Sequence, residues 1–267
     1  MTPDDASVLR RLADRYETAG FLEGDPSWFM HQVEGDLNRE ATAFTASALS
    51  FGSRPQFMAK VAWILERANG DVDAWIRRGA FSRDFRDGDQ SPFYRFFTYG
   101  CMHSFFKAYS RIMEAHGSLG SLVRSRASTG LEAVKAITEA FREAGSSGVV
   151  PMDAKSACKR ICMFLRWMSR DGSQVDIGLW SGFLPKSTLV MPMDTHVVAQ
   201  AKGLGLLRGC SQSMCAARRL TAEMAKIFPG DPLKGDFALF GVGVTGSGEL
   251  SGCAGQDLTV QRDSTVQ

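Results

Sequence analysis

The 267-residue chain has no apolar run of the roughly 18 residues that a membrane-spanning helix needs. Its N-terminus has no basic-then-apolar signal segment, so the sequence predicts no export. Cysteine is also scarce: six cysteines are too few for a scaffold held together by disulfides. These absences predict a cytoplasmic protein that has no membrane partner.

An excess of charge of either sign is missing as well, because 31 basic side chains face 29 acidic ones. Hydrophobic residues make up 44% of the chain, which supplies a core and excludes wholesale disorder. The near-neutral total conceals one basic segment: residues 151–219 sum to +6, and the rest of the chain sums to −4. Such a segment predicts either a surface that binds phosphates or a solvated face of ordinary helices.

Apolar residues recur at helical spacing along most of the chain, and no useful segment alternates with a period of two. We therefore predict an all-α protein, with one helical domain over residues 1–244 and a disordered polar tail over 245–267. The expected helices span 4–19, 36–51, 54–68, 71–78, 91–115, 118–127, 130–144, 153–170, 195–204, 211–227 and 232–242.

The expected helix at 153–170 is amphipathic. At 100° per residue, apolar side chains such as Ile161 and Phe164 share one arc that would face the core. A stripe of mostly basic residues on the opposite side can follow a phosphate backbone. Its other cations lower the pKa expected for Lys159, and a lysine with a lowered pKa can act as an amine nucleophile. The alternative is an ordinary helix with its polar face in solvent. The stripe consists of Lys155, Lys159, Cys162, Arg166 and Arg170.

Asp194 precedes the expected helix at 195–204 and is placed to cap it, because aspartate accepts hydrogen bonds from the first backbone N–H groups. The helix dipole keeps such a carboxylate ionised. An ionised, oriented carboxylate also suits the activation of a nucleophile or the stabilisation of a developing cation. Spacing alone does not choose between capping and catalysis.

Three segments carry a resemblance to a known superfamily. MDTHV at 193–197, followed by LGL at 204–206, resembles the V-D-T-H-(V/I)…R-L-G-L segment of helix-hairpin-helix (HhH-GPD) DNA glycosylases. KRICMFLR at 159–166 is similar to the K-x-x-x-x-F-L-R segment of archaeal and bacterial 8-oxoguanine DNA glycosylases. LKGDFALFG at 233–241 resembles the terminal L-D-x-x-L-W helix of the same group. Residues 16–244 also resemble a sporadically distributed bacterial family of unassigned function.

The resemblance implies a role for each motif. Asp194 corresponds to the essential carboxylate, and Lys159 corresponds to the Schiff-base nucleophile. The implied fold has two closely packed helical subdomains with a cleft between them, and the implied partner of the monomer is double-stranded DNA.

The sequence departs from the superfamily in three respects. The G-x-G that normally precedes the lysine is replaced by Lys155 and Ala157. The separation of 35 residues between Lys159 and Asp194 is longer than usual, with an insertion around 171–190. The C-terminal iron–sulfur cysteine cluster is absent, so we expect no metal and no other cofactor.

A glycosylase must take a base out of the duplex and hold it in a pocket. The candidate pocket residues are Gln32, Ser50, Phe51, Arg54 and Asp236. The candidate DNA contacts are Lys155, Arg160, Arg166, Arg170, Thr195 and His196.

The predicted function is therefore excision of a damaged or modified base, in base excision repair or in defence against phage DNA with modified bases. If Lys159 attacks the sugar, a Schiff base forms and strand cleavage can follow. If Lys159 only anchors a phosphate, water attacks and an intact abasic site remains. The alternatives are a non-catalytic helical DNA-binding module and a helical domain that binds other proteins.

Overall fold

The computed structural model describes residues 3–146, 148–207, 209 and 212–245. The described part is mostly helical, as the periodicity predicts, and its strands form one two-stranded sheet. The α-helices are α1 (Pro3–Tyr16), α2 (Asp36–Leu49), α3 (Arg54–Arg67), α4 (Val72–Arg77), α5 (Tyr99–His116), α6 (Leu119–Arg126), α7 (Gly130–Glu143), α8 (Lys159–Ser169), α9 (Thr195–Gly203), α10 (Met214–Ile227) and α11 (Lys234–Thr245). The strands are β1 (Pro92–Tyr94) and β2 (Phe97–Thr98), and the 3-10 helices are η1 (Ala19–Leu22), η2 (Pro26–His31), η3 (Ala80–Arg83) and η4 (Lys186–Thr188).

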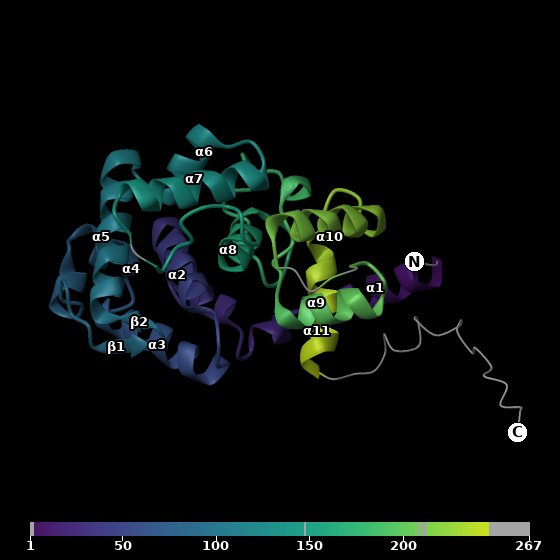
Figure 1. Cartoon of the computed structure of the whole chain (residues 1–267), viewed down its shortest axis with the longest axis horizontal. Coiled ribbons are helices and arrows are strands. Elements are labelled where there is room, and N and C mark those ends of the chain that lie inside the picture. Colours follow the sequence, from purple (N-terminus) through teal and green to yellow (C-terminus); the bar gives the residue numbers. More distant parts are fainter. Residues whose placement is uncertain (1–2, 147, 208, 210–211, 246–267) are drawn as a thin grey trace, which may run out of the picture.

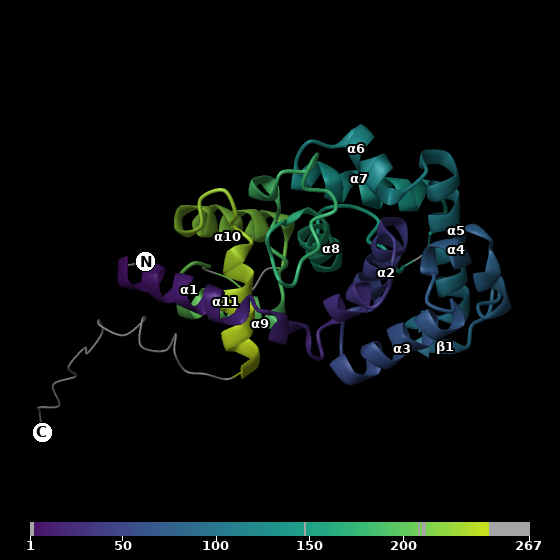
Figure 2. The same ribbon diagram turned by 180° about the vertical axis from the view of Figure 1, so that it is seen from behind.

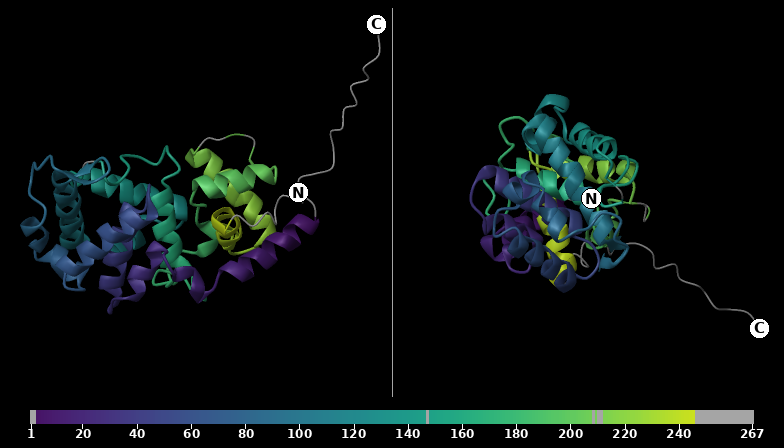
Figure 3. Two further views of the ribbon diagram at one scale, coloured as in Figure 1. Left: turned by 90° about the horizontal axis from the view of Figure 1, so that it is seen from below. Right: turned by 90° about the vertical axis from the view of Figure 1, so that its left-hand side faces the viewer.

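The helices form two groups that do not follow the order of the chain. Helix α1 packs against α11, which in turn packs against α9, so the first helix joins the last ones at one end of the molecule (Figure 1). The view from behind shows the same grouping of α1 with α9, α10 and α11 (Figure 2). The helices from α2 to α8 form the remainder, with α4 and α5 at the end of the molecule away from α1 (Figure 3).

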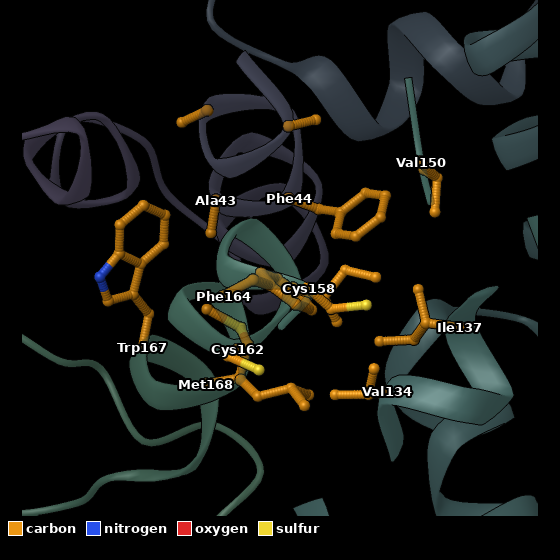
Figure 4. Packing of buried hydrophobic residues seen from close by; sticks show 14 of the residues in the cluster. Ala43, Phe44, Val134, Ile137, Val150, Cys158, Cys162, Phe164, Trp167 and Met168 are labelled. Carbon is orange, nitrogen blue, oxygen red and sulfur yellow. The ribbon is translucent and has the colours of Figure 1, made fainter. Parts of the chain in front are cut away.

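Helix α8 lies in the middle of the core and packs against α2 and α7. Its Phe164 ring meets the Phe44 ring of α2 edge to face, with centroids 5.0 Å apart. On another side, α8 faces Val134 and Ile137 of α7 (Figure 4). The helix is therefore covered on most sides, which an amphipathic helix would not be.

The predicted helix at 91–115 is wrong in its first part, which forms a short antiparallel hairpin before α5 begins. Arg95 takes a left-handed conformation with a φ of 51°, which reverses the chain between the strands. The aromatic rings of the hairpin then pack against α3, α5 and the loop after α2. Adjacent aromatic residues at 93–94 and 96–97 mask the period of two that would reveal so short a hairpin.

The predicted helix at 153–170 starts later than expected, at Lys159. Residues 155–157 instead pair with 212–214: Ala157 N–H donates to Gln212 O at 2.9 Å, and Met214 N–H donates to Lys155 O at 3.1 Å. These long-range backbone hydrogen bonds satisfy groups that a helix would otherwise bond locally.

No helix among the described residues is long and apolar enough to cross a bilayer. Apart from Thr245, the tail predicted at 245–267 lies outside the described residues.

Candidate active site

A cavity of about 460 Å³ opens where the loop after α2, the first turns of α8 and α9, and one side of α11 meet. It contains both residues predicted to be catalytic. It also gathers most of the other predicted site residues, which come from segments far apart in the sequence: Ser50, Phe51, Arg54, Arg166, Thr195, His196 and Asp236.

Lys159 and Asp194 form an ion pair within this cavity, with 2.7 Å between Lys159 Nζ and Asp194 Oδ2. The lysine side chain is 31% exposed and the aspartate side chain 16%. The other oxygen of Asp194, Oδ1, accepts a hydrogen bond from the backbone N–H of His196 at 2.8 Å. Asp194 therefore caps α9 and pairs with the lysine at the same time.

The start of α8 holds Lys159 in place. The bridge between residues 155–157 and 212–214 fixes the preceding chain, and Cys158 then adopts a left-handed conformation with a φ of 46°. Non-glycine residues in that conformation are uncommon and are held there by their surroundings. The turn at Cys158 places the first residue of the helix, Lys159, at the cavity wall.

Electrostatics favours the ionised form of Asp194. Burial opposes its charge, but attraction to Lys159, the hydrogen bond from that ammonium and the His196 N–H outweigh the burial and lower the pKa of Asp194 below its usual value.

Asp236 of α11 lines the same cavity and behaves differently. Burial raises its pKa to about 6, although Arg166 donates a hydrogen bond to it and partly offsets the burial. The cavity therefore holds two carboxyl groups whose pKa values are displaced in opposite directions, a feature that often marks acid–base sites.

The predicted DNA-binding roles of Arg166 and Arg170 are wrong. Both guanidiniums are buried and form ion pairs inside the protein. Arg166 pairs with Asp176 at 3.2 Å and with Asp236, and its guanidinium lies 4.4 Å from the centre of the Phe237 ring. The basic face that the sequence predicted to be in solvent is therefore partly buried here, because carboxylates from outside the helix pair with its arginines. The bonds of Arg170 go to Glu17, Asp176 and Asp231.

Arg160 also points inward. Its guanidinium donates a hydrogen bond to Ala48 O and lies over the Phe51 ring at 5.2 Å and the Phe97 ring at 5.7 Å. Burial lowers its pKa to about 10. Arg160 thus holds the loop after α2 in place; its side chain is partly exposed, and its predicted DNA contact stays a prediction.

Lys155 is accessible, with 90% of its side chain exposed just before α8. Thr195 and His196 are exposed at the cavity. The DNA contacts predicted for these three residues stay predictions. Gln32 is exposed at the end of η2 and is absent from the cavity lining, so its predicted place in the pocket is wrong.

The sequence interpretation missed Phe96 at the tip of the hairpin. This side chain is 68% exposed, and its ring centroid lies 5.0 Å from that of Phe51 in the cavity wall. Gly52 allows this approach, because a Cβ there would lie 2.8 Å from Arg95 Cδ. The only sequence signal was the run of aromatics at 93–97, which periodicity assigned to a helix.

Metal ligands are not grouped in the described part of the chain, which contains no cluster of three or more His, Cys, Asp or Glu side chains suited to an ion. Cys158 and Cys162 are buried free thiols, and burial raises the pKa of both.

Comparison with known proteins finds one family. The family described as protein of unknown function (DUF2400) matches residues 25–245. The match includes every residue that lines the cavity except Phe21. No curated protein and no solved structure matches the chain.

Proposed function

The chain belongs to the DUF2400 family of proteins of unknown function, and from the geometry of its cavity we propose that it is a DNA glycosylase. It flips a damaged or modified base out of double-stranded DNA and cleaves the bond between that base and deoxyribose. The observation that carries the proposal is the 2.7 Å pair between Lys159 and Asp194 inside a cavity of about 460 Å³. A lysine nucleophile needs an adjacent group that takes its proton, and Asp194 is such a group.

The fold that we propose is of the helix-hairpin-helix glycosylase type, with two helical subdomains. One consists of α2 to α8, and the other consists of α1 with α9 to α11. Two observations support this assignment: the cavity is lined from both groups, and Lys159 and Asp194 begin helices that belong to different groups.

The reaction begins with a proton transfer. When a flipped nucleotide displaces water from the cavity, separated charges become less favourable than the neutral amine and acid. The Lys159 ammonium then gives a proton to Asp194 Oδ2, to which it is already hydrogen-bonded.

The neutral amine attacks C1′ of the deoxyribose. The bond from Nζ to C1′ forms as the bond from C1′ to the base breaks, and the base leaves with the electron pair and takes up the proton that Asp194 received from Lys159. The Asp194 carboxylate that remains stabilises the cationic sugar in the transition state and then accepts the proton that the attacking nitrogen loses. Asp194 returns this proton to O4′ as the sugar ring opens to a Schiff base, from which loss of a C2′ proton to solvent expels the 3′ phosphate and cleaves the strand.

Exposed side chains near the cavity are the proposed DNA contacts. Lys155 neutralises a backbone phosphate, and Thr195 and His196 bind the backbone beside the flipped nucleotide. Phe96 is an exposed apolar side chain of the kind that inserts between base steps. A non-catalytic DNA-binding module is less favoured, because it relied on a basic stripe of which Arg166 and Arg170 are buried.

The experiment that tests the function is mass spectrometry of the bases released from duplexes that carry oxidised, alkylated, deaminated or hypermodified bases. Wild-type protein is expected to release one class of base. Asp194→Asn should slow that release by about 1,000-fold, because proton-transfer catalysis is lost, and should leave DNA binding intact.

The matched control is Asp171→Asn. Asp171 forms an aspartate–lysine pair of similar length, 2.6 Å to Lys186, but it does not line the cavity. Its replacement should leave base release at the wild-type rate. Equal activity of the Asp194→Asn variant and the wild-type protein would contradict the proposed function.

A further inference from the structure

A second cavity of about 250 Å³ adjoins the first. The two cavities share Phe21, Asp25, Arg54 and Phe240 in their walls. The Arg54 guanidinium lies 5.5 Å from the centre of the Phe240 ring, so this pair stands where the two spaces meet. A group attached to a molecule in the first cavity can therefore reach the second.

The second cavity is formed by the end of α1, the turn η1 and one side of α11. Its remaining wall consists of Arg15, Tyr16, Thr18, Gly20, Glu23 and Gly241. All of these except Gly241 lie N-terminal to the residues that match the family. The wall is close-packed at Gly241, where a Cβ would lie 2.4 Å from the Tyr16 ring.

The polar groups of this wall are balanced in charge, with Arg15 and Arg54 against Glu23 and Asp25. Asp25 is buried, and its Oδ1 accepts hydrogen bonds from the Ser27 N–H at 3.0 Å and the Ser27 hydroxyl at 2.6 Å. A cationic ligand group would meet two guanidiniums, and an anionic one would meet two carboxylates. A neutral group that both donates and accepts hydrogen bonds suits such a wall best.

The aromatic residues add a second preference. Tyr16, Phe21 and Phe240 contribute ring surface beside the charged groups. Pockets of this mixed kind bind ligands that have an apolar skeleton and several polar groups. A sugar ring, with its C–H groups and several hydroxyls, has both properties.

On the basis of the proposed function, we infer that the base excised by this protein carries a neutral, hydroxyl-rich substituent about the size of a hexose. The base occupies the first cavity beside Lys159 and Asp194, and the substituent passes Arg54 and Phe240 into the second. Selectivity then comes from hydrogen bonds that an unsubstituted base leaves unmade.

The test uses three duplexes that differ at one nucleotide: 5-hydroxymethylcytosine, the same base carrying glucose, and 8-oxoguanine. We expect kcat/KM for the glucosylated base to be at least about tenfold higher than for either small base. Equal rates, or release of the small bases alone, would overturn the inference and leave the glycosylase function standing. If no base is released from these duplexes or from the wider panel of modified DNA, the proposed function fails, and this inference fails with it.

A variant that fills the second cavity separates its role from that of the first. A Cβ at Gly20 would meet only Thr18 Oγ1, at 3.6 Å, and Gly20 lines the cavity, so we expect the ring of Gly20→Trp to occupy it. The ratio of the rates for glucosylated and unglucosylated base should fall at least about tenfold. Gly182→Trp is the control, because a Cβ at this exposed glycine meets nothing within 4 Å and the residue lines neither cavity. An unchanged ratio in Gly20→Trp would contradict the assignment of the second cavity.

Discussion

Helix α8 carries two ion-pair regions that differ in what they can do. At its first residue, Lys159 pairs with Asp194 in a cavity, and both side chains are partly accessible. Two turns further on, Arg166 pairs with buried carboxylates, and so does Arg170, the residue that follows the helix. A lysine can give up its proton, whereas an arginine stays charged under all conditions a protein meets. The first pair is therefore suited to chemistry, and the second region is suited to holding the fold.

The largest expected effect is on covalent chemistry at the accessible pair. Borohydride should trap a covalent adduct between wild-type protein and a substrate duplex, and Lys159→Gln should form none, because its amide is not a nucleophile. The free energy of unfolding should change by less than about 1 kcal/mol, since the pair is partly exposed. Lys186→Gln is the control and should trap as the wild-type protein does. Retained base release without any adduct from the wild-type protein would show that water attacks instead.

The buried region should respond in the opposite way. Arg166→Met leaves Asp236 without its arginine and Asp176 with Arg170 alone, and we expect a loss of about 3–5 kcal/mol in the free energy of unfolding. Urea denaturation monitored by circular dichroism measures this loss. If Arg166→Met were as stable as Lys159→Gln, the proposed difference between the two ion-pair regions would be contradicted.

The pH dependence of stability tests the carboxyl group that the two regions share. The folded pKa of Asp236 is about 6, above the value of about 3.9 expected in the unfolded chain, so its stabilising contribution is complete below pH 4 and is lost as the pH rises through 6. Asp236→Asn mimics the protonated form at every pH. Its stability relative to wild type should therefore improve between pH 4 and pH 7 by up to about 3 kcal/mol. Parallel stability curves for the two proteins would refute the raised pKa.

The smallest expected effect concerns the exposed lysine that precedes α8. Lys155→Gln should weaken duplex binding by about 1 kcal/mol or less and lower the slope of log K against log salt by about 0.9, because one phosphate contact is lost. Lys226→Gln, on the exposed face of α10, is the control. An unchanged slope in Lys155→Gln would remove Lys155 from the DNA interface.

The helices were largely predictable because their periodicity and glycine boundaries are local properties of the sequence. The motifs around Lys159 and Asp194 also predicted two residues that the fold brings to 2.7 Å from each other across 35 positions. In both cases, the information lies within a few turns of helix.

The failures share a different cause. Nothing in the local sequence distinguishes Arg166 and Arg170 from arginines on a protein surface. Their burial depends on pairing with carboxylates from distant segments. The late start of α8 likewise depends on residues 212–214, and the hairpin around Phe96 depends on packing against Phe51 in the loop after α2. These features depend on contacts between residues far apart in the sequence, and a local sequence pattern does not reveal such contacts.

The two side chains that are proposed to react belong to different groups of helices. Lys159 belongs to the helices around α2, whereas Asp194 belongs to those held by the contact of α1 with α11. The distance between them therefore depends on how the two groups of helices pack together, and neither group by itself contains both members of the pair. A change in that packing, such as a methyl group added at Gly241 against the Tyr16 ring, is expected to alter the distance between Lys159 and Asp194 without replacing either residue. In the proposed glycosylase, substitutions where the two groups of helices meet would therefore change the reaction rate, as substitutions in the cavity wall would.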